Sequence, residues 1–130
     1  MKKILLIIVL GLLMNANAYA EWLYVTTISR GDDNNKIKTY IDLKTFKKDK
    51  NYSYIWILDD LTIPFKNTKS SASHHQIDCK LTRSKVLQYI FYTDQMGTGM
   101  PKPFVRDTIK WTSYPPGSQM FNLIKVICNS

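Results

Sequence analysis

The N-terminal segment, residues 1–20, constrains the fold most, because it has the form of a secretory signal peptide. Lys2 and Lys3 form a positive start, residues 4–14 are apolar, and alternating small residues follow. This order is typical of a leader that is cleaved before position 21. The apolar run is shorter than the roughly 20 residues that span a bilayer. We therefore expect a cleaved signal peptide and one exported domain, residues 21–130, in the periplasm or on the outer cell surface.

The chain has two cysteines, Cys79 and Cys128, and both belong to the expected exported domain. An oxidising compartment favours pairing of an even number of cysteines. We predict one disulfide, and a closed loop of about 50 residues gives roughly 4 kcal/mol of stabilisation, less any strain. A catalytic thiol or a metal ligand is the alternative, for which His74 and His75 are potential neighbours.

Aromatic and β-branched residues gather in short runs between polar turns, which predicts β-strands. The run at 52–58 is apolar on both faces, so we expect it at the centre of the sheet and expect Pro64 to end its segment. Residues 65–73 are polar, basic and rich in serine, and are predicted to form a surface loop. The predicted strands are residues 21–28, 39–42, 52–58, 74–79, 84–93 and 108–112.

One C-terminal helix is predicted after the Pro115–Ser118 turn. Ser118 is a good N-cap, and four apolar residues then recur at helical spacing, namely Met120, Leu123, Ile124 and Ile127. The helix is expected to end at Cys128. The predicted fold class is α+β: a single small domain with a mostly antiparallel sheet of about six strands, one helix packed on it and one disulfide.

Three short motifs invite a catalytic or metal-binding interpretation. His74–His75 and Asp59–Asp60 are neighbours on strands, so their side chains point to opposite faces and do not easily share a metal or a proton. We interpret the aspartates as the polar end of a strand. Met96–Gly99 lacks the lysine and the strand-to-helix context of a phosphate loop, and a turn with positive φ explains its glycines. We predict a non-enzymatic protein with no metal or cofactor.

Positive charge is the main indication of a binding function. Eighteen Lys and Arg against ten Asp and Glu give +8, and loss of Lys2 and Lys3 with the signal leaves +6. Such a field attracts acidic protein segments and sulfated glycans. A surface that only keeps the protein soluble is the simpler explanation of the excess of basic residues. The candidate partner-binding residues are Lys47, Lys48, Lys66 and Lys69. Export argues against nucleic acid as the partner.

Several segments form a recognisable set when they are taken in order: Tyr40–Asp42, Ile55–Leu58 before Pro64, Ile77–Cys79, Met96–Gly99, Trp111, Pro115–Ser118 and Ile127–Cys128. Over most of residues 22–128 this set resembles the bacterial surface-adhesin protein E family. The resemblance implies a small sheet-and-helix domain stapled by a Cys79–Cys128 bridge.

The same resemblance implies adhesion to host extracellular-matrix proteins such as vitronectin and laminin, and formation of a homodimer. In adhesin-type members the basic segment before the first cysteine takes part in binding. The corresponding residues 65–76 hold only Lys66 and Lys69, fewer basic residues than that pattern carries. A periplasmic interaction or inhibitor module without a host ligand is therefore the alternative function.

Overall fold

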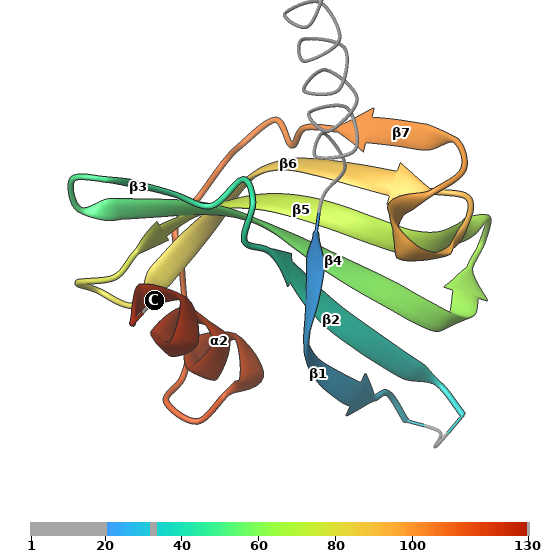
Figure 1. The fold of residues 1–130 in the computed structure, drawn as a ribbon, viewed down its shortest axis with the longest axis horizontal. Coiled ribbons are helices and arrows are strands. Elements are labelled where there is room, and N and C mark those ends of the chain that lie inside the picture. Colours follow the sequence, from blue (N-terminus) through green and yellow to red (C-terminus); the bar gives the residue numbers. More distant parts are fainter. Residues whose placement is uncertain (1–20, 32–33, 130) are drawn as a thin grey trace, which may run out of the picture.

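The computed structural model describes residues 21–31 and 34–129, which form one antiparallel sheet with a helix on one face (Figure 1). The main strand order is β1-β2-β4-β5-β6-β7, with β3 beside β4 and β8 beside β6. The predicted α+β fold is confirmed, and the two short strands bring the described sheet to eight. The expected signal peptide lies outside the described residues. The elements are β1 (Trp22–Ser29), β2 (Lys36–Asp42), β3 (Lys47–Asp49), β4 (Tyr52–Phe65), β5 (Thr68–Asp78), β6 (Arg83–Tyr92), a 3-10 turn η1 (Gln95–Gly97), β7 (Pro101–Phe104), β8 (Thr112–Ser113) and α2 (Gln119–Cys128).

The long β4–β5 hairpin is the centre of the sheet, and it corrects two sequence predictions. Residues 65–73 do not form a loop, because β5 begins at Thr68 and pairs with β4, Asp60 opposite Ser70. Their serines look polar in sequence, but Ser70 is 0% exposed and donates a hydrogen bond to the Asp94 carbonyl at 2.7 Å. Pro64 does not end β4, because it lies where the β4–β5 register is irregular and no ladder hydrogen bond is required of it.

The hydrophobic core lies between the sheet and α2. Alternation along β4 turns Ile55 and Ile57 toward the helix, and both are almost completely buried. The helix contributes the buried residues that its sequence spacing predicted, Leu123, Ile124 and Ile127. Ser118 caps the helix as predicted, because its hydroxyl accepts a hydrogen bond from the Phe121 N–H at 3.3 Å.

The predicted disulfide joins the end of β5 to the end of α2. The Sγ atoms of Cys79 and Cys128 are 2.03 Å apart and their Cα atoms 5.8 Å apart. No free cysteine is left in the described part of the chain, so neither a catalytic thiol nor a cysteine metal ligand is formed. The bridge fixes α2 against the sheet at the end where β5 finishes.

The C-terminal third of the sheet differs from the sequence prediction. The strand expected at 108–112 is reduced to Thr112–Ser113, and β7 was not predicted at all. Its two prolines argue against a central strand but are tolerated at an edge, and β7 pairs only with β6. The turn before it confirms the glycine prediction, because Gly97 and Gly99 have φ of 68° and 84°.

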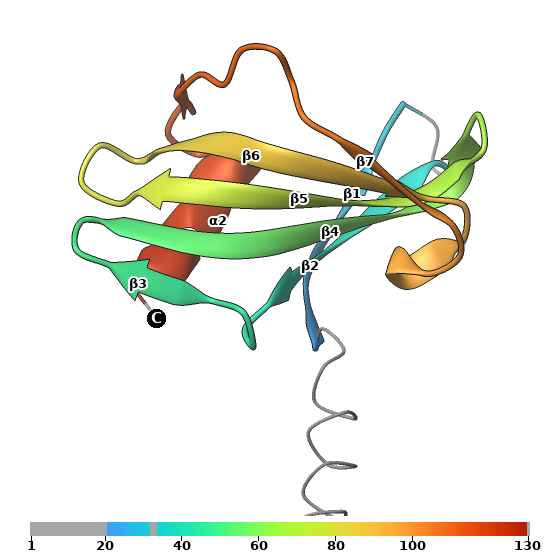
Figure 2. The same ribbon diagram turned by 90° about the horizontal axis from the view of Figure 1, so that it is seen from above.

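The two ends of the sheet differ, and so do its two faces, because only one face carries the helix. The β1–β2, β4–β5 and β6–β7 turns gather at one end, which we call the hairpin end, and the disulfide lies at the other. The helix has 10 residues and β4 has 14, which correspond to roughly 15 Å and 45 Å. Seen in Figure 2, α2 therefore lies behind only part of the sheet, and the strands in front carry no helix.

Candidate functional site

The four predicted partner-binding lysines lie in two separate places. Lys47 and Lys48 are on β3, opposite Tyr54 and Ser53 near the disulfide end. Lys66 and Lys69 are at the β4–β5 turn, at the hairpin end. The length of β4 between the two pairs corresponds to roughly 40 Å. The structure therefore does not bring the four lysines together into one site.

The β4–β5 turn presents apolar and basic side chains together. Phe65 is 69% exposed and Ile63 is 46% exposed. Lys66 adopts a left-handed conformation at φ 56°, and its Nζ lies 5.7 Å from the centroid of the Phe65 ring. We call residues 63–69 the tip. An exposed aromatic ring beside a cation is a typical composition for a protein-binding surface.

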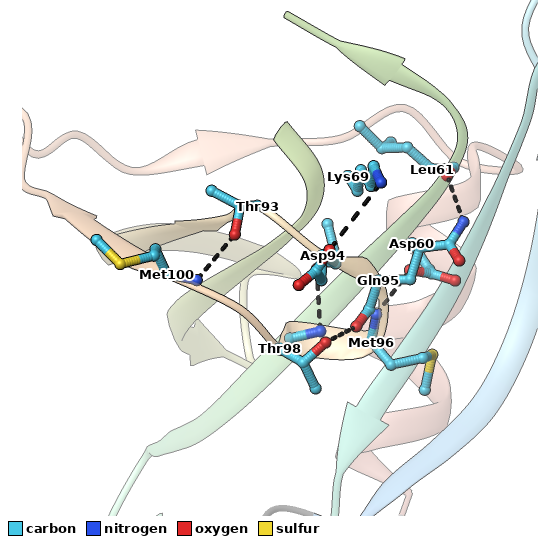
Figure 3. A network of polar contacts seen from close by, with 11 residues as sticks. Asp60, Leu61, Lys69, Thr93, Asp94, Gln95, Met96, Thr98 and Met100 are labelled. Carbon is cyan, nitrogen blue, oxygen red and sulfur yellow. Dashed lines mark hydrogen bonds and ion pairs between the residues drawn. The ribbon is translucent and has the colours of Figure 1, made fainter. Parts of the chain in front are cut away.

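Hydrogen bonds fasten the strand residues that flank the tip to the neighbouring β6–β7 turn (Figure 3). The Met96 N–H donates to the Asp60 carboxylate at 2.8 Å, and the Gly97 N–H donates to the Ser70 hydroxyl at 2.9 Å. Lys69 Nζ lies 4.0 Å from Asp94 Oδ1, and both side chains are about half exposed. Such a solvent-exposed ion pair contributes under about 1 kcal/mol, so Lys69 stays accessible to a partner.

A second basic cluster lies around Trp111 and was not recognised from the sequence. Arg83 Cζ and Lys85 Nζ lie 4.5 and 4.6 Å from the centroid of the Trp111 ring. Tyr52 stacks on the same ring at 5.7 Å, and Arg83 Nε donates to Asp78 at 3.1 Å. These cations hold the segment before β8 against the sheet by cation–π contacts. No sequence pattern links Tyr52, Arg83 and Trp111, which lie far apart in the chain.

The two histidines lie on opposite faces, as predicted. His74 stacks on Trp56 at 4.7 Å on the face without the helix, whereas His75 is only 6% exposed on the helix side. Burial, with a smaller contribution from His74, lowers the pKa of His75 to about 4. The described residues contain no group of three or more His, Cys, Asp and Glu residues with metal-site geometry.

Ser73 and His75 form a pair that resembles a nucleophile and its base. Ser73 Oγ lies 2.9 Å from His75 Nε2, but His75 Nδ1 faces the Ser84 hydroxyl at 3.5 Å and not a carboxylate. An imidazole with a pKa near 4 is a weak base at neutral pH, and activation of a serine requires a base matched to its task. This geometry therefore gives little support to nucleophilic catalysis.

Asp59 and Asp60 also point to opposite faces, but they do not end the strand as predicted, because β4 continues to Phe65. Asp60 supports the β6–β7 turn. Asp59 lies on the helix side and accepts a hydrogen bond from Thr39 Oγ1 at 2.8 Å. Burial raises the pKa of Asp59, and the Thr39 hydrogen bond and the charge of Arg30 partly oppose that shift.

Comparison with known proteins decides the family. A family model described as "Surface-adhesin protein E" matches residues 22–129. The chain belongs to the surface-adhesin protein E family. Membership points to a surface adhesin, and so to an exported binding protein more than to an enzyme. No curated protein matches the chain by sequence.

Solved structures of Haemophilus influenzae protein E share the fold. One is 16% identical with a TM-score of 0.64, covering 82% of this chain and 83% of that chain. A second crystal form is 17% identical with a TM-score of 0.63, covering 85% and 97%. A third structure, from the non-typeable bacterium, is 13% identical with a TM-score of 0.62, covering 85% and 86%. At such identities the likeness establishes the fold alone. Among the described residues no helix is long and apolar enough to cross a membrane.

Proposed function

We propose that this adhesin binds a host extracellular-matrix protein through the hairpin end of the sheet. Vitronectin and laminin are the first candidates, because the family resemblance implies them. The observation that carries the proposal is the composition of the tip, where the exposed Phe65 ring lies beside Lys66 and close to Lys69. Met100, 73% exposed, lies in the turn that the tip is fastened to.

The apolar and basic side chains have different roles in this proposal. An exposed aromatic ring is the type of residue that anchors protein interfaces. Lys66 and Lys69 attract an acidic segment over a longer distance and orient it. Charges at the surface are screened within roughly 8 Å at physiological ionic strength. Binding by the tip is therefore expected to weaken as the salt concentration rises.

The test compares two double variants that remove the same charge from opposite ends of the sheet. We expect Lys66→Ala with Lys69→Ala to lower the affinity for immobilised vitronectin or laminin by about tenfold, as two charge-assisted contacts would. The matched control, Lys47→Ala with Lys48→Ala, is expected to bind like the unchanged protein. Equal losses in both double variants would show that net charge, and not the tip, determines binding. Binding that neither variant changes would overturn the basic-tip proposal.

A Phe65 variant separates the contribution of the aromatic ring to binding from that of Lys66 and Lys69. Phe65→Ala removes no charge, so it is expected to lower affinity without changing the dependence on salt. Val126 on α2 is 58% exposed, and Val126→Ala is the matched apolar control away from the tip. A Phe65→Ala protein with full affinity would limit the site to the lysines.

A further inference from the structure

A partly open cavity of about 290 Å³ lies between the sheet and the start of α2. It forms where the short helix begins and the inner face of β4 and β5 is no longer covered by helix side chains. Residues from β1, β2, β4, β5, β6 and α2 all contribute to its lining. Its volume is close to the lower limit of small-molecule sites.

Part of the cavity lining is polar. It is formed by Thr39, Asp59, Ser73 and His75, which strand pairing places side by side: Thr39 opposite Asp59, and Ser73 opposite the neighbouring Ile57. Asp59 is the only charged residue among those that line the cavity. His75, with a pKa of about 4, adds no positive charge at neutral pH.

The rest of the lining is mostly apolar. Ile57, Val86, Met120 and Leu123 contribute to it, together with the ring of Tyr89. A ligand that fills the cavity therefore meets both hydrocarbon surface and a carboxylate with neighbouring hydroxyl groups. This combination, apolar walls with a few convergent polar groups, is typical of small-molecule sites.

We propose that the cavity binds a small primary amine with an apolar or aromatic body, its ammonium group on Asp59. An ionised carboxylate only accepts hydrogen bonds, and an ammonium group donates three. Asp59 receives one from Thr39, and a charge-assisted bond from a ligand is stronger than a neutral one. The proposal is independent of adhesion at the tip, which is far from α2 in Figure 1.

An anionic ligand does not fit the same cavity. Asp59 would repel it, and no Lys or Arg is among the lining residues. A neighbouring hollow of about 270 Å³ shares Val86, Tyr89 and Tyr114 but is lined by Arg106 and Lys110. An anion is therefore expected to prefer that hollow. Whether a charged probe binds in the cavity or in the hollow then shows which charge each of them prefers.

Three probes of similar shape test the charge preference: 2-phenylethylamine, 2-phenylethanol and 3-phenylpropionate. Each is titrated into the disulfide-bonded protein and followed by NMR. We expect the amine to bind at roughly millimolar affinity, as is usual for a ligand of this size, and at least tenfold more tightly than the carboxylate. Its phenyl protons are expected to give NOEs to the methyl groups of Met120 and Leu123.

Two substitutions assign the preference to Asp59. Asp59→Asn keeps the shape and the acceptor for Thr39 but removes the charge, and is expected to lower amine affinity at least tenfold while leaving 2-phenylethanol unchanged. The matched control is Asp60→Asn, the same change on the other face of β4. Native NOEs within the core show that each variant is folded.

Four results of the titrations would overturn the proposal. They are no saturable amine binding, equal affinity for amine and carboxylate, unchanged amine affinity in Asp59→Asn, or an equal loss in Asp60→Asn. Contacts of the amine with residues outside the cavity would overturn it as well. Because adhesion to matrix protein is measured with the lysine variants, failure of one proposal leaves the other test unaffected.

Discussion

His75 is a buried imidazole whose protonation the fold opposes. Its pKa is about 4 in the folded protein, chiefly because burial penalises the charged ring, whereas an unfolded histidine has a pKa near 6.5. Between these two values the unfolded chain binds more protons. The free energy of unfolding therefore falls as the pH is lowered from about 6.5 to about 4, by about 3 kcal/mol in total. Urea unfolding measured across this range tests the prediction.

Two substitutions isolate the histidine contribution. His75→Gln removes the titrating group, so its unfolding free energy is expected to depend less on pH in this window. His74→Gln is the control, because His74 is half exposed and its pKa is lowered by burial alone. Asp59 acts in the opposite sense, since its raised pKa adds stability as the carboxyl becomes protonated at low pH. Parallel pH profiles for the unchanged protein and His75→Gln would contradict the assignment.

Several single residues were predictable because their roles are local. Asp42 caps the turn that follows it, as an aspartate at such a position favours: its carboxylate accepts from the Lys44 N–H at 3.0 Å and from Thr45 Oγ1 at 2.8 Å. Ser118 and the glycines at 97 and 99 are similar cases. The sequence did not reveal that Asp59 and Ser73 line one cavity, since that depends on the register of three strands.

Among the secondary-structure elements, the local sequence pattern predicted the helix well but misled for one strand. Helix α2 was predicted residue by residue, because helical spacing places its apolar side chains on one face. The same method failed for the first half of β5, where Ser70 is buried and Ser73 half-buried although both are polar. Ser70 bonds to the β6–β7 turn, and Ser73 faces the cavity. A polar strand cannot be told from a loop by hydropathy alone.

The disulfide joins α2 to the end of β5, and its removal has a measurable cost. The bridge closes a separation of 49 residues, which corresponds to about 4 kcal/mol in the chain-entropy model. We expect Cys79→Ser with Cys128→Ser to lower the free energy of unfolding in urea by that amount. Reduction of the unchanged protein is the control and should give the same shift. A loss below about 1 kcal/mol would show that core packing alone docks the helix.

At the scale of the whole molecule, charge is spread and not concentrated. The lysines chosen as one set from the sequence lie at the two ends of a long sheet. A third group is engaged with Trp111. Only folding reveals this separation, because sequence distance does not show which strand ends meet. The homodimer implied by the family resemblance stays a prediction.

Position in the cell envelope decides whether adhesion is the direct role of the molecule. A matrix-binding protein must present the tip outside the cell, whereas a periplasmic interaction module is enclosed by the outer membrane. We expect protease added to intact cells to cleave the protein, and an antibody raised against the tip to label such cells. A periplasmic protein of known location serves as the control for membrane integrity. If cleavage and labelling occur only after the outer membrane is permeabilised, the matrix-protein proposal fails and the tip is a contact for another envelope component.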